Sequence, residues 1–141
     1  MTRYLLDTNI LSDLIRNPQG KAARRIGKQI GKAGEASVCT SVIVAAELRY
    51  GCAKIAKKSG SPRLSKAVED LLSEIEVLPF EPPADVDYGD IRAALEAAGT
   101  PIGGNDLLIA AHARALGAIV VTANVAEFKC VRGVKVENWL G

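Results

Sequence analysis

The sequence predicts an α/β fold in which helices cover a central, mainly parallel sheet of four to five strands. Short apolar runs of β type alternate with helical stretches along the 141 residues, an order typical of strand–helix–strand units. No internal repeat or low-complexity tract interrupts this alternation. The hydrophobic content of 48% is that of a globular chain with one core. We therefore expect residues 1–141 to form a single domain.

In the first half of the chain, apolar runs and two-faced helical stretches follow one another. The elements expected there are a strand over 3–7, a short helix ending near Asn17-Pro18, a helix over 19–33, a strand over 36–39 and a helix from Ser41 to about Lys58. In the helix over 19–33 the apolar side chains fall within about 100° of one another, opposite a stripe of basic ones. Gly27 and Gly31 each weaken that helix by about 1 kcal/mol relative to alanine, so tertiary packing must hold it.

The second half continues the alternation after a loop at KKSGSP. We expect a helix over 63–75, a short strand over 77–80, a helix from Pro83 or Ala84 to Ala98, a helix over 105–116, a strand over 118–123 and a last short strand near 134–136. Asp85 and Asp87 lie in the first turn of one helix, where the helix dipole favours acids. Gly117 ends another, because glycine readily closes a helix. The run AIVVTA is the clearest strand pattern.

The formal net charge of +2 hides an uneven distribution. Residues 1–68 hold thirteen lysines and arginines against four acids, whereas residues 69–96 hold nine acids against one arginine. A basic half is compatible with a polyanionic partner. The basic stripe of the helix over 19–33 is either a solvated face or a surface that follows an RNA backbone. The stripe consists of Lys21, Arg25, Lys28 and Lys32, with Arg24 beside it.

Cysteine usage and hydropathy indicate the compartment. Cys39, Cys52 and Cys130 form no C-x-x-C pair, and we interpret them as buried free thiols in a reducing cytosol. No apolar run reaches the roughly 18 residues that a membrane span needs. The amino terminus shows no apolar core of a signal peptide. We therefore expect a cytoplasmic protein without membrane contact.

Glu47 stands in an unexpected place. Its neighbours on the expected helix face are Ile43, Val44, Tyr50 and Gly51, with no Lys or Arg among them. A buried carboxylate without a partner costs several kcal/mol, so such groups become protonated, pair with a cation or bind a metal. The alternative is a glutamate at the rim of this face whose carboxylate reaches water.

Three further polar residues gain meaning when they are taken together. Asp7 follows the first expected strand, Asn124 follows the strand over 118–123, and Asp106 opens a helix after PIGGN. Each alone is explained as a cap or turn residue. In a parallel sheet, however, the carboxyl ends of the strands meet at one edge, where ligands bind. Carboxylates gathered there repel one another unless a cation neutralises them. Oxygen ligands suit Mg²⁺ or Mn²⁺ better than zinc, so the sequence predicts a metal site.

Four segments in order carry a resemblance to a known family. LLDTNIL, AELRYG, PIGGNDLLIAAHA and VVTANVAEF, with the ending ENW, resemble PIN-domain proteins of the VapC toxin group over essentially the whole chain. The resemblance implies a three-layer α/β/α PIN-like fold and a Mg²⁺-dependent endoribonuclease, the toxin of a toxin–antitoxin pair. By motif, it assigns Asp7, Glu47 and Asp106 as catalytic metal ligands, Asn124 as a fourth catalytic residue, and Thr8 and Thr122 as polar residues flanking the site.

The resemblance also implies a reaction and partners. A metal-activated water would attack the phosphorus and leave 5′-phosphate and 3′-hydroxyl ends, and Mn²⁺ would substitute for Mg²⁺. Because Asn124 replaces an acid found in many PIN domains, a second tightly held metal is not implied. A transfer RNA is the leading candidate substrate. The family further implies a homodimer and a cognate VapB-like antitoxin that blocks the active site.

Single residues argue against two rival enzyme functions. Metal-free ribonucleases commonly use two histidines, whereas this chain has only His112, which we expect to be structural. A Mg²⁺-dependent aspartyl phosphatase or phosphotransferase wants a second aspartate two residues after Asp7, where Asn9 stands. A non-cleaving PIN-like module that binds RNA or protein stays open as a third interpretation. The presence of all three main acids argues for activity.

Overall fold

The centre of the molecule is a five-stranded sheet in the order β3-β2-β1-β4-β5. In this computed structural model, which describes residues 1–30, 36–60 and 62–141, every neighbouring pair of strands is parallel. The strands are β1 (Thr2–Leu6), β2 (Ala36–Ser41), β3 (Glu76–Leu78), β4 (Ile119–Val121) and β5 (Lys135–Glu137). The prediction of a mainly parallel sheet of four to five strands is confirmed.

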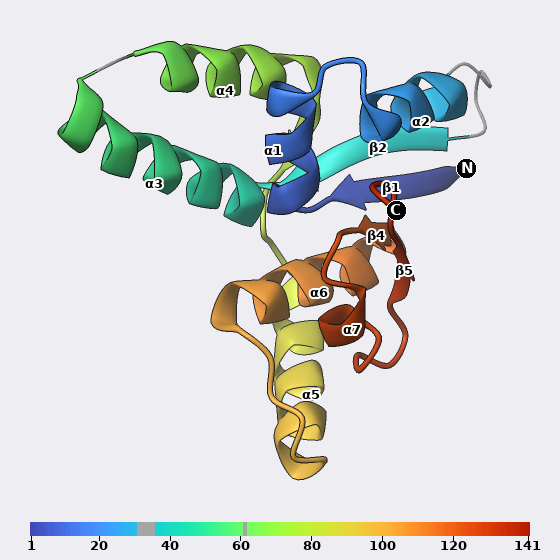
Figure 1. The fold of residues 1–141 in the computed structure, drawn as a ribbon. Coiled ribbons are helices and arrows are strands. Elements are labelled where there is room, and N and C mark those ends of the chain that lie inside the picture. The colour runs from blue at the N-terminus through green and yellow to red at the C-terminus, as the bar shows by residue number, and fades with distance from the viewer. Residues whose placement is uncertain (31–35, 61) are drawn as a thin grey trace.

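Helices cover both faces of this sheet (Figure 1). They are α1 (Thr8–Arg16), α2 (Lys21–Ile30), α3 (Val42–Ser59), α4 (Arg63–Glu74), α5 (Ala84–Ala97), α6 (Gly104–Leu116) and α7 (Val125–Phe128). Figure 1 shows α1 and α2 on one side of the sheet, and α5, α6 and α7 on the other. The hairpin of α3 and α4 projects from the edge, and α3 contacts both α1 and α6.

The middle strand β1 lies in the core and explains the apolar runs of the sequence. Leu5 and Leu6 are fully buried, as expected for a parallel strand covered on both faces. The buried Thr40 of β2 donates from Oγ1 to the carbonyl of Leu6 at 2.7 Å. Polar groups in this core are therefore satisfied by the neighbouring strand.

The structure corrects several predicted boundaries. The helix α3 continues through the first residues of the predicted KKSGSP loop and ends at Gly60, which has φ +67°, because glycine closes helices in this conformation. The predicted strand over 118–123 is limited to three residues, and α7 was not predicted. Cys39 and Cys52 are buried as expected, whereas Cys130 is exposed, so the expectation of a buried thiol was wrong there.

Some expectations concern residues that the structure does not describe. The end of the predicted helix over 19–33, with Lys32, falls outside the described residues. Among the helices that are described, none is both long and apolar enough to cross a membrane.

The topology brings two distant strand ends together. From β1 the chain crosses to β2 on one side, while β4 joins β1 from the other side. The backbone N–H of Asp7 donates to the carbonyl of Val121 at 2.9 Å, extending the ladder between β1 and β4. Such a reversal of strand order opens a crevice at the carboxyl ends of the strands. Asp7 and Thr122 lie at this point.

The core makes a stability prediction. Replacing the fully buried Ile109 of α6 by alanine should lower the free energy of unfolding by about 2–5 kcal/mol, because apolar contacts are lost and a cavity remains. Ile55 of α3 is 45% exposed, so Ile55→Ala should cost less than about 1 kcal/mol. Urea titrations with an unchanged m-value would test both variants. Equal losses would contradict the assigned core.

Candidate active site

Asp7 is the buried anchor of the candidate site. It is the N-cap of α1 and only 2% exposed. Its Oδ1 accepts a hydrogen bond from the backbone N–H of Thr8 at 2.8 Å. Its Oδ2 accepts from Thr122 Oγ1 at 2.8 Å and from Asn9 Nδ2 at 3.3 Å. Both carboxylate oxygens are therefore held in fixed directions.

Thr122 and Asn9 hold the two strand ends around this carboxylate. While the buried Thr122 hydroxyl donates to Asp7, its oxygen accepts from Asn9 Nδ2 at 3.2 Å and from the backbone N–H of Asn124 at 3.0 Å. Asn9 Oδ1 in turn accepts from the N–H of Ala123 at 2.9 Å. The sequence interpretation gave Asn9 no such role, although it stands in the quoted segment LLDTNIL.

Glu47 approaches the site from α3. Its Oε1 accepts a hydrogen bond from Thr8 Oγ1 at 2.8 Å, and its side chain is half-buried. Thr8 thus binds Asp7 through its backbone and Glu47 through its side chain. Among the ion pairs of the described residues, none involves Glu47. Within the described part of the chain, the carboxylate of Glu47 thus has a hydroxyl partner and no ion pair with a Lys or Arg side chain.

Asp106 completes the group from the first turn of α6. Burial, a hydrogen bond with the carboxylate of Glu127 and the charges of Asp7, Glu127 and Glu47, in this order of size, together raise the pKa of Asp106 to about 7. The three acids singled out from the sequence are therefore within electrostatic reach of one another. The raised pKa favours the protonated form of Asp106 at neutral pH far more than is usual for an aspartate.

Glu127, in the short helix α7, is the member of the group that sequence reasoning missed. It occurs three residues after Asn124, in the quoted segment VVTANVAEF, and an isolated turn of helix gives no periodicity that would have distinguished it. Asn124 itself is exposed. Its backbone N–H binds Thr122, and no hydrogen bond is recorded between its side chain and an acid in the described part of the chain.

The donor chemistry of this group fits a divalent cation. Burial is the main cause that raises the pKa of Asp7, the charge of Glu47 adds to it, and the hydrogen bonds from Thr122 and Thr8 oppose it. Within residues 1–30, 36–60 and 62–141, no three His, Cys, Asp or Glu side chains converge closely enough to enclose a metal on their own. Mg²⁺ usually keeps several waters and takes only one or two carboxylates. The mutual repulsion of these acids therefore fits a hydrated divalent ion.

His112 lies in the core behind the site. It is 2% exposed, and its Nδ1 is 2.8 Å from Ser41 Oγ. Burial lowers its pKa, so the neutral ring is favoured. Its ring packs edge-on against Phe80, with 5.5 Å between the ring centroids. These contacts agree with the structural role expected for this histidine.

The basic stripe of α2 is divided by tertiary contacts. Arg25 pairs with Glu137 at 3.4 Å and lies over the ring of Trp139, with its guanidinium carbon 5.5 Å from the ring centroid. Lys21, Arg24 and Lys28 have no ion pair to any described residue. None of the described residues of this stripe forms a hydrogen bond with Asp7, Glu47 or Asp106.

Comparisons with known proteins bear on this arrangement. The sequence matches the PIN domain over residues 4–132. It is 40% identical over 141 residues to Ribonuclease VapC2 of Haemophilus influenzae, covering 99% of this chain and 100% of that protein. It is 39% identical over 140 residues to the tRNA(fMet)-specific endonuclease VapC of Shigella flexneri, covering 99% of each.

A solved structure shows the same fold. VapBC2 from Rickettsia felis bound to a DNA fragment from their promoter contains a chain that superposes with a TM-score of 0.87 at 33% identity, covering 98% of this chain and 99% of that one. PIN-domain nucleases generally depend on a divalent metal ion. With its fold, its order of segments and full-length relatives in agreement, the chain belongs to the PIN-domain family and, within it, to the VapC ribonucleases.

Proposed function

We propose that the chain is the toxin of a type II toxin–antitoxin pair, an endoribonuclease that cuts RNA at the cluster of Asp7, Glu47, Asp106 and Glu127. The observation that carries the proposal is the gathering of these acids, with Asp7 and Glu47 joined through Thr8 and Asp106 close enough for their charges to raise its pKa. Burial is the largest cause of that rise, and the neighbouring carboxylates of Glu127, Asp7 and Glu47 add to it. The gathering lies at the strand-order reversal, where α/β folds bind ligands.

In this proposal Asp7, Glu47 and Asp106 hold Mg²⁺, and Mn²⁺ substitutes for it. The bound ion would polarise the scissile phosphate and lower the pKa of a water. Hydrogen bonds from Thr8 and Thr122 orient the Asp7 carboxylate and oppose the rise of its pKa on burial. Positive charge at the site would favour the ionised form of Asp106 over its protonated form.

The remaining residues would position the site. Thr8 orients the Glu47 carboxylate through the 2.8 Å hydrogen bond from its hydroxyl. Asn124, exposed next to Thr122, keeps the proposed fourth catalytic role, with its amide available to the phosphate of an incoming RNA. The cut leaves 5′-phosphate and 3′-hydroxyl ends without using the RNA 2′-hydroxyl. Since one relative is a tRNA(fMet)-specific endonuclease, a transfer RNA is the proposed substrate.

A cognate VapB-like antitoxin is the proposed partner, as the relative from Rickettsia felis was solved as VapBC2. A groove of about 410 Å³ between α1, α3 and α4 offers it a seat. The groove is mostly apolar, with Ile15, Leu48 and Ile55 among its lining residues, and it reaches Thr8 and Glu47. A segment lying there would block the acids directly, with an Arg or Lys inserted among them.

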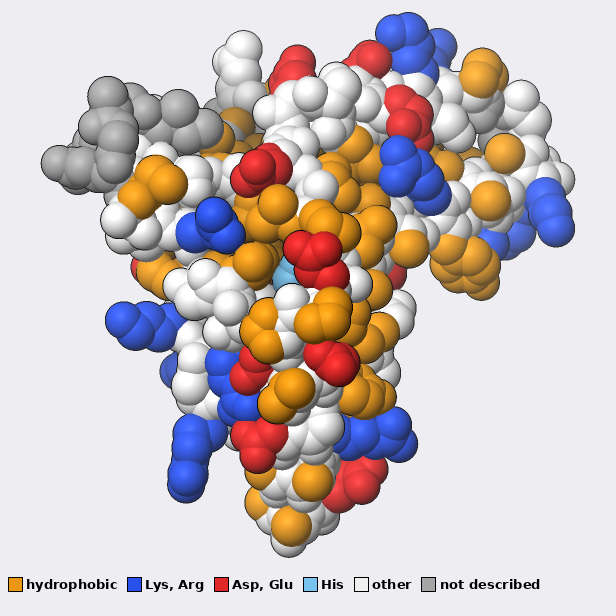
Figure 2. All heavy atoms as spheres, turned by 180° about the vertical axis from the view of Figure 1, so that it is seen from behind, with side chains coloured by type: hydrophobic (Ala, Val, Ile, Leu, Met, Phe, Trp, Pro, Cys, Tyr) orange, Lys and Arg blue, Asp and Glu red, His pale blue; other side chains and the backbone are white. Residues whose placement is uncertain are grey.

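Further parts of the proposal concern assembly and location. Figure 2 shows one face of the molecule on which hydrophobic side chains gather toward the middle and several Lys and Arg side chains lie at the margins. This face offers apolar surface for the proposed homodimer. We propose that the chain works in the cytoplasm as one PIN domain over residues 1–141. The phosphotransferase alternative gains no support, because Asn9, in place of a second acid, is bound to Ala123 and Thr122.

The first test is cleavage of end-labelled transfer RNA and total RNA by the purified chain. Cutting should require Mg²⁺ or Mn²⁺, stop in EDTA and leave 5′-phosphate ends. Asp7→Asn should slow it by about 100-fold or more, because the neutral amide binds the proposed metal ion more weakly than the carboxylate does. The exposed Asp85 gives a matched control, and Asp85→Asn should cut at the wild-type rate. Cutting that persists in EDTA would exclude a metal-dependent mechanism.

The second test uses the pH dependence of stability in EDTA. Because the folded pKa of Asp106, about 7, lies above its ordinary value of 3.8, the folded chain binds the proton more tightly than the unfolded chain. Stability should therefore fall as pH rises from about 4 to 7 and level off above that. Asp106→Asn should flatten this fall, and Asp85→Asn should not. Thermal melts at pH 5 and pH 8 measure the effect.

The same melts test the cation. Mg²⁺ or Mn²⁺ should raise the midpoint of the wild-type chain more at pH 8 than at pH 5, because at pH 5 protons compete for Asp106. In the Glu127→Gln variant, Mg²⁺ or Mn²⁺ should raise the melting midpoint by less, since one of the negative charges that act on Asp106 is removed. A midpoint that is insensitive to both pH and cation in the wild-type chain would show that the acids do not form a binding site.

A further inference from the structure

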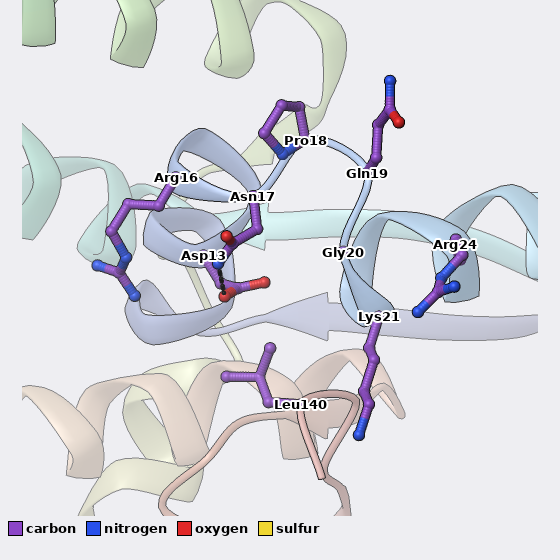
Figure 3. A pocket seen from close by; sticks show the side chains of 9 residues that line it. All are labelled: Asp13, Arg16, Asn17, Pro18, Gln19, Gly20, Lys21, Arg24 and Leu140. Carbon is purple, nitrogen blue, oxygen red and sulfur yellow. Dashed lines mark hydrogen bonds between the residues drawn. The ribbon is translucent and has the colours of Figure 1, made fainter.

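A polar cavity lies away from the acids, between the end of α1 and the start of α2. Its volume is about 650 Å³. The lining residues are Asp13, Arg16, Asn17, Pro18, Gln19, Gly20, Lys21, Arg24 and Leu140. In Figure 3, Arg16 and Arg24 flank the carboxylate of Asp13, and Lys21 extends toward the loop that carries Leu140. Asn17 donates from Nδ2 to Asp13 Oδ1 at 2.8 Å, so this carboxylate is already engaged.

The positive charge of this cavity is not compensated. Three cations, Arg16, Lys21 and Arg24, face one carboxylate. None of the three has an ion pair with a residue that the structure describes. Arg25, which lies on α2 beside Arg24, is instead paired with Glu137. Uncompensated cations in a concave site focus the field on an anion. Two arginines among them favour phosphate, which guanidinium groups bind through paired hydrogen bonds.

Arg16 connects this cavity to the acids. It lines the cavity and also the groove that contains Thr8 and Glu47. The helix α1, with Asp7 at its start and Arg16 at its end, has nine residues, a length of about 13 Å. At about 3.4 Å per nucleotide of a stacked strand, that distance corresponds to about four nucleotides. One RNA strand can therefore occupy both places.

We propose that Arg16, Lys21 and Arg24 bind a backbone phosphate of the RNA substrate a few nucleotides away from the cut. The proposal rests on the function proposed above. It restricts the RNA contact expected from the basic stripe to Lys21 and Arg24, adds Arg16 from the preceding helix, and excludes Arg25, which is held by Glu137 and Trp139. A phosphate site of this kind positions the strand without reading its sequence.

The test compares two pairs of charge removals. Lys21→Gln with Arg24→Gln removes two cations from the cavity, and Lys57→Gln with Lys58→Gln removes two from the far end of α3. All four side chains are exposed, so both double variants should unfold at the wild-type temperature. Arg16→Gln is a third, single variant. Cleavage of one transfer RNA is measured over a range of RNA and salt concentrations.

The cavity variant should raise KM about tenfold, with the loss on KM rather than kcat. The slope of log affinity against log salt should fall by about 1 for each phosphate contact removed. Arg16→Gln should act in the same direction, and the α3 control should remain near wild type. If the two double variants have equal effects, the loss is explained by the net charge of the protein and not by this cavity, and the proposal is overturned.

Two further outcomes keep the proposals apart. If the wild-type chain cuts RNA but the cavity variants have unchanged KM and salt slope, only the phosphate site is wrong. If the wild-type chain cuts no RNA under any divalent metal, the proposed function fails, and the phosphate site fails with it. Loss of antitoxin binding with unchanged RNA cleavage would also overturn the proposal, in favour of an acidic protein segment in the cavity.

Discussion

The burial of the Asp7 carboxylate is the constraint on which the rest of the site depends. At 2% exposure, an unsatisfied carboxylate would cost several kcal/mol. Three donors prevent this, and they come from the start of α1 and from the end of β4. Their positions require β1 and β4 to be neighbours with their carboxyl ends level. The order of strands in the sheet and the polarity of the site thus have one common cause.

The other acids are satisfied much less completely. Glu47 has one hydroxyl partner, and burial together with the neighbouring acids raises the pKa of Asp106 to about 7. The protein tolerates this repulsion because the apolar layers of Leu5, Leu6 and their neighbours stabilise the sheet independently of the acids. The apolar core stabilises the fold, whereas the repulsion among the carboxylates of the site destabilises it. Such a trade-off is expected at functional sites, where like charges must be held close together.

The sequence predicted secondary structure well where a periodic pattern of apolar residues extends over several residues. It did not predict features that depend on a single tertiary contact. Long helices and the parallel sheet follow from patterns of apolar residues. Glu127 was missed because a single helical turn has no such pattern. Asn124 was expected beside the acids, as it follows a strand. In the structure it follows β4, which ends at Val121, and its N–H is bound by Thr122 while the residue is exposed, so its catalytic role stays a prediction. The basic stripe was divided by Glu137, more than a hundred residues away.

The separation of Asp7 from Thr122 also has a consequence for biosynthesis. The hydrogen bond between them spans 115 residues, so a growing chain carries Asp7, Glu47 and Asp106 before the hydroxyl that orients Asp7 has been made. At about 5–20 residues per second, the ribosome needs on the order of 10 s to travel from one residue to the other. Contacts this distant in sequence also close late in folding. The complete acid cluster, which also includes Glu127, therefore assembles only when nearly the whole protein has been translated.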